Sequence, residues 1–256
     1  MNMIDAHQHL YSAPGSLDNL IKMSEEAGIV KVCLSACGEQ YGQPGNKAVK
    51  QAFDLYPDLI VGLGYVRLGI DSCDLVERLH GEGFGGIKVI NPRKNYSDNE
   101  FYPIYEKATK YKMHILFHTG VVARQERDGE FDTASERMRP IFLDRIARTF
   151  PELTLIGAHL GVPWYDEACW VALANPNVYF DLSGVAHFLS SKPASFFENL
   201  TGWERAKGKL LFGVDGGYET KKTVIKNTKR LMMNLNFSEE LVQKVFYENM
   251  AQILGY

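Results

Sequence analysis

The chain has 256 residues, of which 45% are hydrophobic, and a net charge of −3 at neutral pH. This length suits one large folded domain, and the lack of a basic stripe argues against nucleic acid as a partner. No apolar run approaches the roughly 20 residues of a membrane helix, and we expect the first strand to begin at Met3 without a leader, which favours a cytoplasmic protein with no membrane partner. Four irregularly spaced cysteines predict neither a disulfide framework nor a zinc ribbon.

Strand and helix signals alternate eight times along the chain. After Ser16, for example, Leu17, Leu20 and Ile21 recur at helical spacing, and Gly28 stands where a left-handed cap would end the helix. Alternation of this kind is typical of a parallel sheet with helical crossovers, and eight units predict a closed (β/α)8 TIM barrel as a single domain over residues 1–256. We predict strands at 3–10, 29–36, 59–66, 85–90, 114–118, 154–159, 178–182 and 210–215, and further helices after Asp71 and at 138–150, 219–235 and 238–254.

Histidines and one aspartate stand where the predicted strands end. His7 and His9 lie two residues apart on the first strand, so both side chains point to the same face. His118, His159 and Asp215 each end an apolar run that is followed within two residues by glycine. Histidines of an ordinary core would fall at arbitrary heights along the strands, whereas a barrel keeps its chemistry at the carboxyl ends. The pattern therefore predicts a metal site.

Two other histidines are excluded from this site. His80 falls on a predicted helix, and His114 falls early in a predicted strand, away from its carboxyl end. We therefore expect neither of them to take part in metal binding.

The ordered set of His-x-His, two later histidines and an aspartate, together with the closing segment 246–255, resembles the amidohydrolase superfamily. It is most similar to the amidohydrolase 2 group of metal-dependent hydrolases and decarboxylases. The resemblance implies a distorted (β/α)8 barrel with one or two divalent ions, of which zinc is the expected one. It makes His7, His9 and His118 metal ligands and Asp215 a further ligand that also moves protons. It makes His159 either a ligand of a second metal or a general acid/base.

The chemistry of these residues agrees with that division of roles. Three neutral imidazoles and a carboxylate leave one coordination position for water, whose pKa falls toward about 7 on a divalent ion. Asp215 would accept the proton of this water and pass it to a leaving group.

Lys88 lies on the fourth predicted strand and has two interpretations. In binuclear members of the superfamily a fourth-strand lysine is carbamylated and bridges two metals. Lys88 stands three residues before Asn91, which is deep for a ligand at the barrel mouth, so we favour a buried ion-paired or substrate-facing lysine.

The loops after the strands are expected to select the substrate. Arg93 follows the fourth strand, and Arg124 and Arg127 follow the fifth. Guanidinium groups match the geometry of a carboxylate, so these arginines are candidates for binding an anionic substrate, with solvated surface charge as an equal alternative. Trp164 borders the sixth loop and is a candidate pocket residue.

The sequence therefore predicts a metal-dependent hydrolase that cleaves a C–N or C–O bond of a small amide, lactone or ester through a metal-activated water. The alternative is a metal-dependent decarboxylase of a small carboxylated aromatic or enoic acid. A barrel kept only for binding is disfavoured, because the ligand set is complete. The expected partner is a small molecule, and the sequence leaves open whether the chain forms a homodimer.

Overall fold

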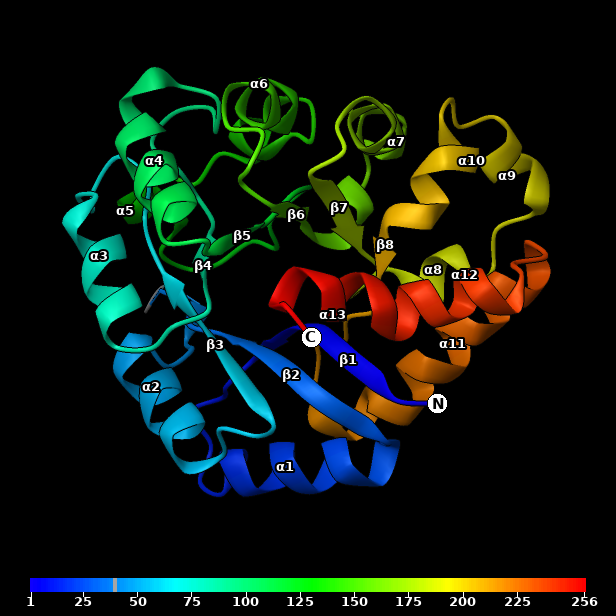
Figure 1. The fold of residues 1–256 in the computed structure, drawn as a ribbon, viewed down its shortest axis with the longest axis horizontal. Coiled ribbons are helices and arrows are strands. Elements are labelled where there is room, and N and C mark those ends of the chain that lie inside the picture. Colours follow the sequence, from blue (N-terminus) through cyan, green and yellow to red (C-terminus); the bar gives the residue numbers. More distant parts are fainter. Residues whose placement is uncertain (39–40) are drawn as a thin grey trace.

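Eight parallel strands form one sheet in the order of the sequence in the computed structural model, which describes residues 1–38 and 41–256 (Figure 1). Two backbone hydrogen bonds link the first strand to the segment after the last, from Ala6 to Phe212 (2.9 Å) and from Asp215 to His7 (2.8 Å). The predicted (β/α)8 barrel is therefore confirmed. The strands are β1 (Met3–His9), β2 (Ile29–Ser35), β3 (Ile60–Tyr65), β4 (Gly86–Val89), β5 (His114–Phe117), β6 (Leu155–Gly157), β7 (Val178–Asp181) and β8 (Leu210–Leu211).

Helices surround the sheet and follow the expected signals. Ser16 begins α1, and Gly28 ends it with φ of 75°. Ser238 caps the last helical segment through its Oγ, and this segment contains a π-helical turn at Lys244–Glu248. In the part of the chain that is described, no helix has the length and apolarity to cross a bilayer. The α-helices are α1 (Ser16–Ala27), α2 (Asn46–Leu55), α3 (Asp74–Gly81), α4 (Tyr102–Lys110), α5 (Asp128–Phe131), α6 (Phe142–Thr149), α7 (Tyr165–Ala174), α8 (Ala186–Leu189), α9 (Ala194–Glu198), α10 (Trp203–Ala206), α11 (Lys221–Asn234), α12 (Glu239–Gln243) and α13 (Asn249–Leu254).

Every predicted strand is present, and every one ends earlier than predicted. The difference is largest at the chemically important ends, because β6 stops at Gly157 and β8 stops at Leu211. His159 has φ of 60° and Asp215 has φ of 44°, a left-handed backbone that cannot continue a strand. These side chains are thus carried by turns just beyond the sheet, and not by the strands themselves.

An irregularity in β1 decides where its histidines point. Asp5 pairs with Val32 and Gln8 pairs with Leu34, which leaves two residues, Ala6 and His7, opposite one residue of β2. Two residues opposite one define a β-bulge, which changes the direction in which the side chains of the strand point. Ala6 packs in the cluster that fills the barrel, so a regular strand would point His7 the other way. The extra residue lets both Ala6 and His7 face inward.

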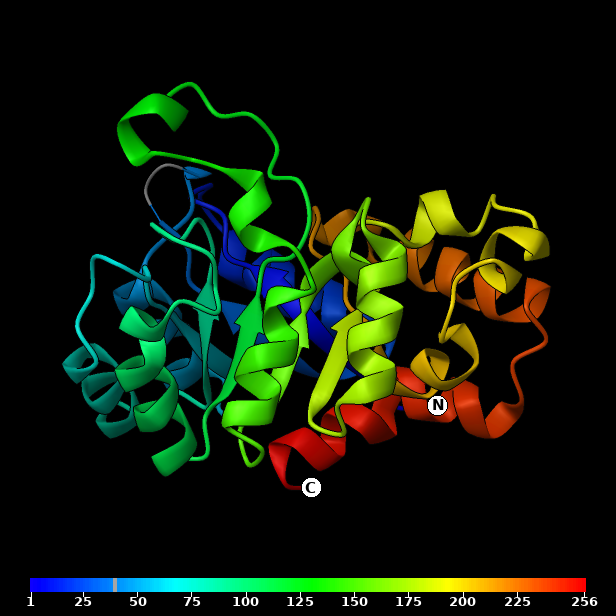
Figure 2. The same ribbon diagram turned by 90° about the horizontal axis from the view of Figure 1, so that it is seen from above.

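Apolar residues from six strands fill the interior of the barrel, and Met250 and Ala251 of α13 close one end of this cluster. A second, larger cluster lies between the sheet and the surrounding helices. Figure 2 shows the strand arrows pointing away from α13 and toward the side where the loop carrying α5 rises. The open mouth of the barrel is therefore at the carboxyl ends of the strands, as the fold requires for a functional site.

Candidate metal centre

His7 and His9 meet at the centre of the mouth. Their Nε2 atoms are 3.2 Å apart, and Oδ1 of Asp215 is 3.5 Å from Nε2 of His9 and 3.9 Å from Nε2 of His7. A tetrahedral ion with ligands at about 2.0–2.1 Å holds its ligand atoms about 3.4 Å apart. The three side chains thus form a group whose donor atoms fit one divalent ion.

The opposite nitrogen of each ring is held by the protein. Nδ1 of His9 donates to the carbonyl of Ser35 at 3.0 Å, and Nδ1 of His7 lies 3.0 Å from Oδ2 of Asp181. Because these oxygens accept a hydrogen bond, Nδ1 carries the proton in both rings and the lone pair lies on Nε2, which in His7 faces Nζ of Lys88 at 3.0 Å. The tautomer that a metal ligand requires is therefore built in.

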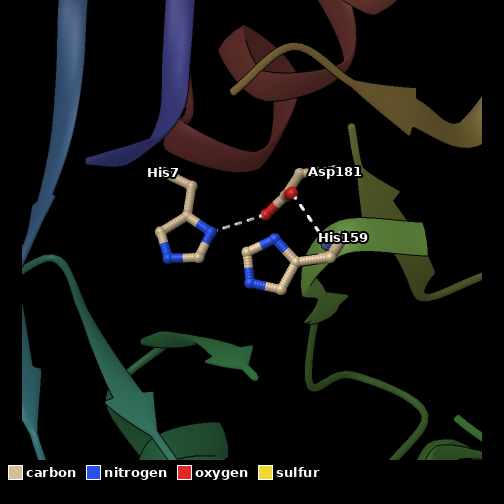
Figure 3. Close-up of side chains that lie close together, drawn as sticks. All are labelled: His7, His159 and Asp181. Carbon is tan, nitrogen blue, oxygen red and sulfur yellow. Dashed lines mark hydrogen bonds and ion pairs between the residues drawn. The ribbon is translucent and has the colours of Figure 1, made fainter. Parts of the chain in front are cut away.

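Asp181 is the residue of this centre that sequence reasoning missed. Its carboxylate is fully buried and also accepts the backbone N–H of His159 at 3.0 Å, so that it links the His7 ring of β1 to the backbone of the turn after β6 (Figure 3). Ser183 adds its backbone N–H at 2.9 Å and its hydroxyl at 2.6 Å. The available signal was the acidic residue near the end of the predicted strand 178–182, which repeats the pattern of Asp215.

His7, His159 and Asp181 also have donor atoms close enough to hold an ion. Hydrogen bonds occupy this face, because Nδ1 of His7 faces Asp181 and Nδ1 of His159 donates to the carbonyl of Ser183 at 2.9 Å. We therefore interpret Asp181 as a residue that orients the His7 ring and holds the backbone of His159, while Ser183 holds the His159 ring. Nε2 of His159 is left 3.5 Å from Oδ2 of Asp215.

His118 reaches the same cavity from β5. Its ring centre is 4.9 Å from that of His159, and its Nε2 is buried without a hydrogen-bond partner in the described residues. A buried polar atom normally has a partner, so an imidazole nitrogen that has none and lies in the cavity of the ligand group fits a role as a metal ligand.

Burial sets the charge state of these groups. It lowers the pKa of His9 to about 3, in spite of the opposing charge of Asp215, and it lowers the pKa of His118 and His159 as well. Burial acts to raise the pKa of Asp215, but the neighbouring His7, His9 and His159 outweigh it and hold the value below its usual range. Neutral imidazoles beside an ionised carboxylate are the forms that bind a metal.

The structure brings Lys88 to this centre. The side chain is 1% exposed, and its Nζ lies 3.0 Å from Nε2 of His7. Burial lowers its pKa, and none of the ion pairs among the described residues includes it. The position is compatible with both interpretations of Lys88, as a modified lysine or as a cation that faces the substrate.

The cavity above the centre has a volume of about 200 Å³, below the roughly 300 Å³ at which drug-sized sites begin, so it suits a small substrate. None of the four weaker candidates from the loops is among the described residues that line it. Its lining consists of His7, His9, Cys37, Tyr41, Gln43, Lys88, Ile90, His118, Val122, Ala123, Gln125 and Asp215.

Those four candidates lie elsewhere at the surface. Arg93 pairs with Asp132 at 3.4 Å, Arg127 pairs with Glu130 at 2.7 Å, and Arg124 is exposed. Trp164 is half-buried, and the guanidinium of Arg139 lies 5.4 Å from the centre of its ring. Surface pairing is the alternative that the sequence left open for the arginines.

A buried ion pair lies next to the residues of the centre and was not predicted from the sequence. Asp5 and Lys221 are 0% and 1% exposed, and Nζ of Lys221 is 3.0 Å from the carboxylate. The same carboxylate accepts the backbone N–H groups of Val214 (2.9 Å) and His7 (3.3 Å). Asp5 thus ties β1 to the turn that carries Asp215.

Comparison with known proteins agrees with this architecture. The amidohydrolase family model matches residues 4–256, so the chain belongs to the amidohydrolase family and the predicted resemblance is confirmed. Members of this superfamily typically use a divalent metal, and the His and Asp groups described above are able to bind one. No curated protein sequence matches the chain.

Several solved structures share the fold over the whole chain. An uncharacterized TIM-barrel protein from Bordetella bronchiseptica has 17% identity and a TM-score of 0.74, with 100% of this chain and 99% of that chain covered. A probable 2-pyrone-4,6-dicarboxylic acid hydrolase from Acinetobacter baumannii has 15% identity, a TM-score of 0.67 and full coverage of both chains. The 5-carboxyvanillate decarboxylase of Sphingomonas paucimobilis has 13% identity, a TM-score of 0.66 and 99% coverage of each chain. At these identities the likeness concerns the fold.

Proposed function

We propose that the protein is a metal-dependent hydrolase that cleaves a C–N or C–O bond of a small amide, lactone or ester. One observation carries the proposal: the unprotonated Nε2 atoms of His7 and His9 meet the carboxylate of Asp215 within 3.2–3.9 Å at the floor of a small cavity. His118 supplies a further nitrogen, and the borderline character of imidazole and carboxylate ligands suits zinc.

The bound ion would act as a Lewis acid that acidifies water and polarises the scissile carbonyl. Asp215 lies between His9 and His159, so its carboxylate is placed to take a proton from an attacking water and return it to the leaving group. His159 has Nδ1–H committed to Ser183, which leaves Nε2 as the atom that accepts or gives a proton. The ammonium group of Lys88 is placed to donate to a substrate oxygen.

Decarboxylation is the second candidate, and Lys88 is the observation that favours it. A buried cation beside the ligand group would hold the carboxylate of a small aromatic or enoic acid next to the ion. Three of the similar structures are named as decarboxylases, one acting on 5-carboxyvanillate and two on 2,6-dihydroxybenzoate. The same His159 would then protonate carbon in place of a leaving nitrogen or oxygen.

The test combines metal analysis with a substrate panel on the zinc- and manganese-loaded protein. Proton release reports hydrolysis of lactones and esters, amine release reports hydrolysis of amides, and carbon dioxide release reports decarboxylation. We expect His7→Ala and Asp215→Asn to lose the metal. His159→Asn should lose about 10²- to 10⁴-fold in turnover and keep its fold, whereas the matched variant of the exposed His80, His80→Asn, should behave as the parent.

Three results would decide against parts of this proposal. Protein that binds no divalent ion under any loading condition would refute the metal centre. Carbon dioxide release without hydrolysis would replace the first candidate by the second. Loss of one of two bound ions in His159→Asn would assign His159 as a ligand and not as an acid/base.

A further inference from the structure

A buried arginine beside the metal cavity has no role in the site described above. Arg67 follows β3 and is 8% exposed. One Nη donates to the carbonyl of Phe131, and the guanidinium lies 5.2 Å from the centre of the Phe131 ring. Its Nε is buried and has no partner in the described part of the chain. A guanidinium is always charged, so Arg67 is a desolvated cation with an unused donor.

The charges around Arg67 do not balance. Asp132 is already shared by two other arginines, Arg93 at 3.4 Å and Arg137 at 2.8 Å. Asp71 accepts the backbone N–H of Arg67 at 2.7 Å, and none of the ion pairs among residues 1–38 and 41–256 includes the guanidinium. The three guanidinium groups of Arg67, Arg93 and Arg137 therefore face two carboxylates, those of Asp132 and Asp71, at the rim of the mouth. The excess is positive, which favours an anion.

The hydrogen bond from Arg67 to the α5 loop does not by itself explain why the residue at this position is charged. The carbonyl of Phe131 also accepts Nδ2 of Asn91 at 3.3 Å, and the same amide donates to Thr133 at 3.0 Å. A neutral donor thus holds this loop already. Burying a cation without a carboxylate is costly, so Arg67 needs a further reason to be present.

The space next to Arg67 adjoins the metal cavity. Arg67 and Phe131 line a cavity of about 640 Å³, and Cys37 lines both this cavity and the one above the ligand group. Burial raises the pKa of the Cys37 thiol to about 11, so this shared lining residue is a small neutral side chain at neutral pH. A ligand that passes Cys37 would have one end at the metal centre and the other near Arg67.

We propose that this second cavity is an anion subsite in which Arg67 binds a carboxylate of the substrate. The substrate class is then a small acid whose carboxylate is remote from the reacting bond. The assignment of the anion to the substrate rests on the proposed function, whereas binding of an oxyanion by Arg67 does not.

Two binding experiments separate these two statements. Calorimetric titration of the metal-free protein with inorganic phosphate tests the subsite alone. Titration of the zinc-loaded protein with benzoate and with isophthalate, which has a second carboxylate, tests its connection to the metal centre. The variants are Arg67→Met, Arg67→Lys and, as a matched control, Arg230→Met, because Arg230 is an exposed arginine of α11 and is not among the residues that line either cavity.

We expect isophthalate to bind the parent at least about tenfold more tightly than benzoate. A hydrogen bond to a charged group increases affinity by about this factor. Arg67→Met should remove this gain and weaken phosphate binding by a similar factor, Arg67→Lys should restore part of both, and Arg230→Met should change neither. Thr133→Val, which removes an acceptor of Asn91, loosens the same loop and should leave phosphate binding intact.

The contrary outcomes are distinct. Phosphate binding that survives in Arg67→Met, or that is lost equally in Thr133→Val, would overturn the subsite. Phosphate binding that depends on Arg67, with no gain for isophthalate over benzoate, would overturn the link to the substrate and assign a free oxyanion. A protein that binds no metal would refute the proposed function and still permit the phosphate test.

Discussion

Replacing Asp181 by asparagine tests most directly the hydrogen bonds that orient the residues of the metal centre. Oδ1 of Asp181 accepts three donors, the backbone N–H groups of His159 (3.0 Å) and Ser183 (2.9 Å) and the Ser183 hydroxyl (2.6 Å). Among the described residues, Oδ2 accepts only Nδ1 of His7, at 3.0 Å. Asparagine keeps one carbonyl oxygen, so the three donors on Oδ1 retain their acceptor and the amide NH2 group faces His7.

An NH2 group in that place donates where the carboxylate accepted. His7 must then either lose this hydrogen bond or move its proton to Nε2, the atom that is to bind the metal. A hydrogen bond to a charged group contributes about 1.5 to 3 kcal/mol, so the variant should bind zinc about 10- to 100-fold more weakly. Burial acts to raise the pKa of Asp181, but His7 and the donated hydrogen bonds hold it below its usual value, so the carboxylate is ionised at neutral pH.

Competition with a chromogenic zinc chelator at pH 7 measures this affinity. The matched control is Asp144→Asn, because the Asp144 carboxylate forms an ion pair with Arg148 on the protein surface, and the urea midpoint of both variants shows whether the fold is retained. Zinc affinity within about threefold of the parent, in an Asp181→Asn protein that is folded, would show that Asp181 does not set the tautomer of His7 or that Nε2 of His7 is not a ligand.

Two further predictions concern stability. Lys221→Met leaves Asp5 as a buried unpaired carboxylate and should cost about 3–5 kcal/mol in urea unfolding, with recovery in the double variant Asp5→Asn/Lys221→Met; a loss below about 1 kcal/mol would contradict this account. Burial lowers the pKa of His114 to about 4 from its ordinary 6.5, so the unfolded chain binds the extra proton between these values and stability falls as the pH falls from about 6.5 to 4. The loss approaches about 3 kcal/mol, and His114→Leu in the metal-free protein should show a flatter pH dependence than the parent.

The sequence by itself determined the barrel and the residue types of its centre. Apolar runs of strand length alternate with helical periodicity, and because parallel strands end at one edge, His7, His9, His118, His159 and Asp215 were expected at one mouth. This inference needs only local periodicity and the direction of the chain. The assignment of these five residues as ligands and acid/base groups stays a prediction, and the structure brings them to one cavity or its edge.

Only the tertiary structure decided how those side chains are aimed and supported. The bulge at Ala6 and His7, and the left-handed backbone of His159 and Asp215, depend on which strand pairs with which, and no local pattern records them. The partners of the centre come from distant segments, as Asp181 does for His7, 174 residues away. The same reason separates Arg67 from Arg93, Arg124 and Arg127: a sequence shows which residues carry charge, whereas burial and the lack of a counter-charge are properties of the folded chain.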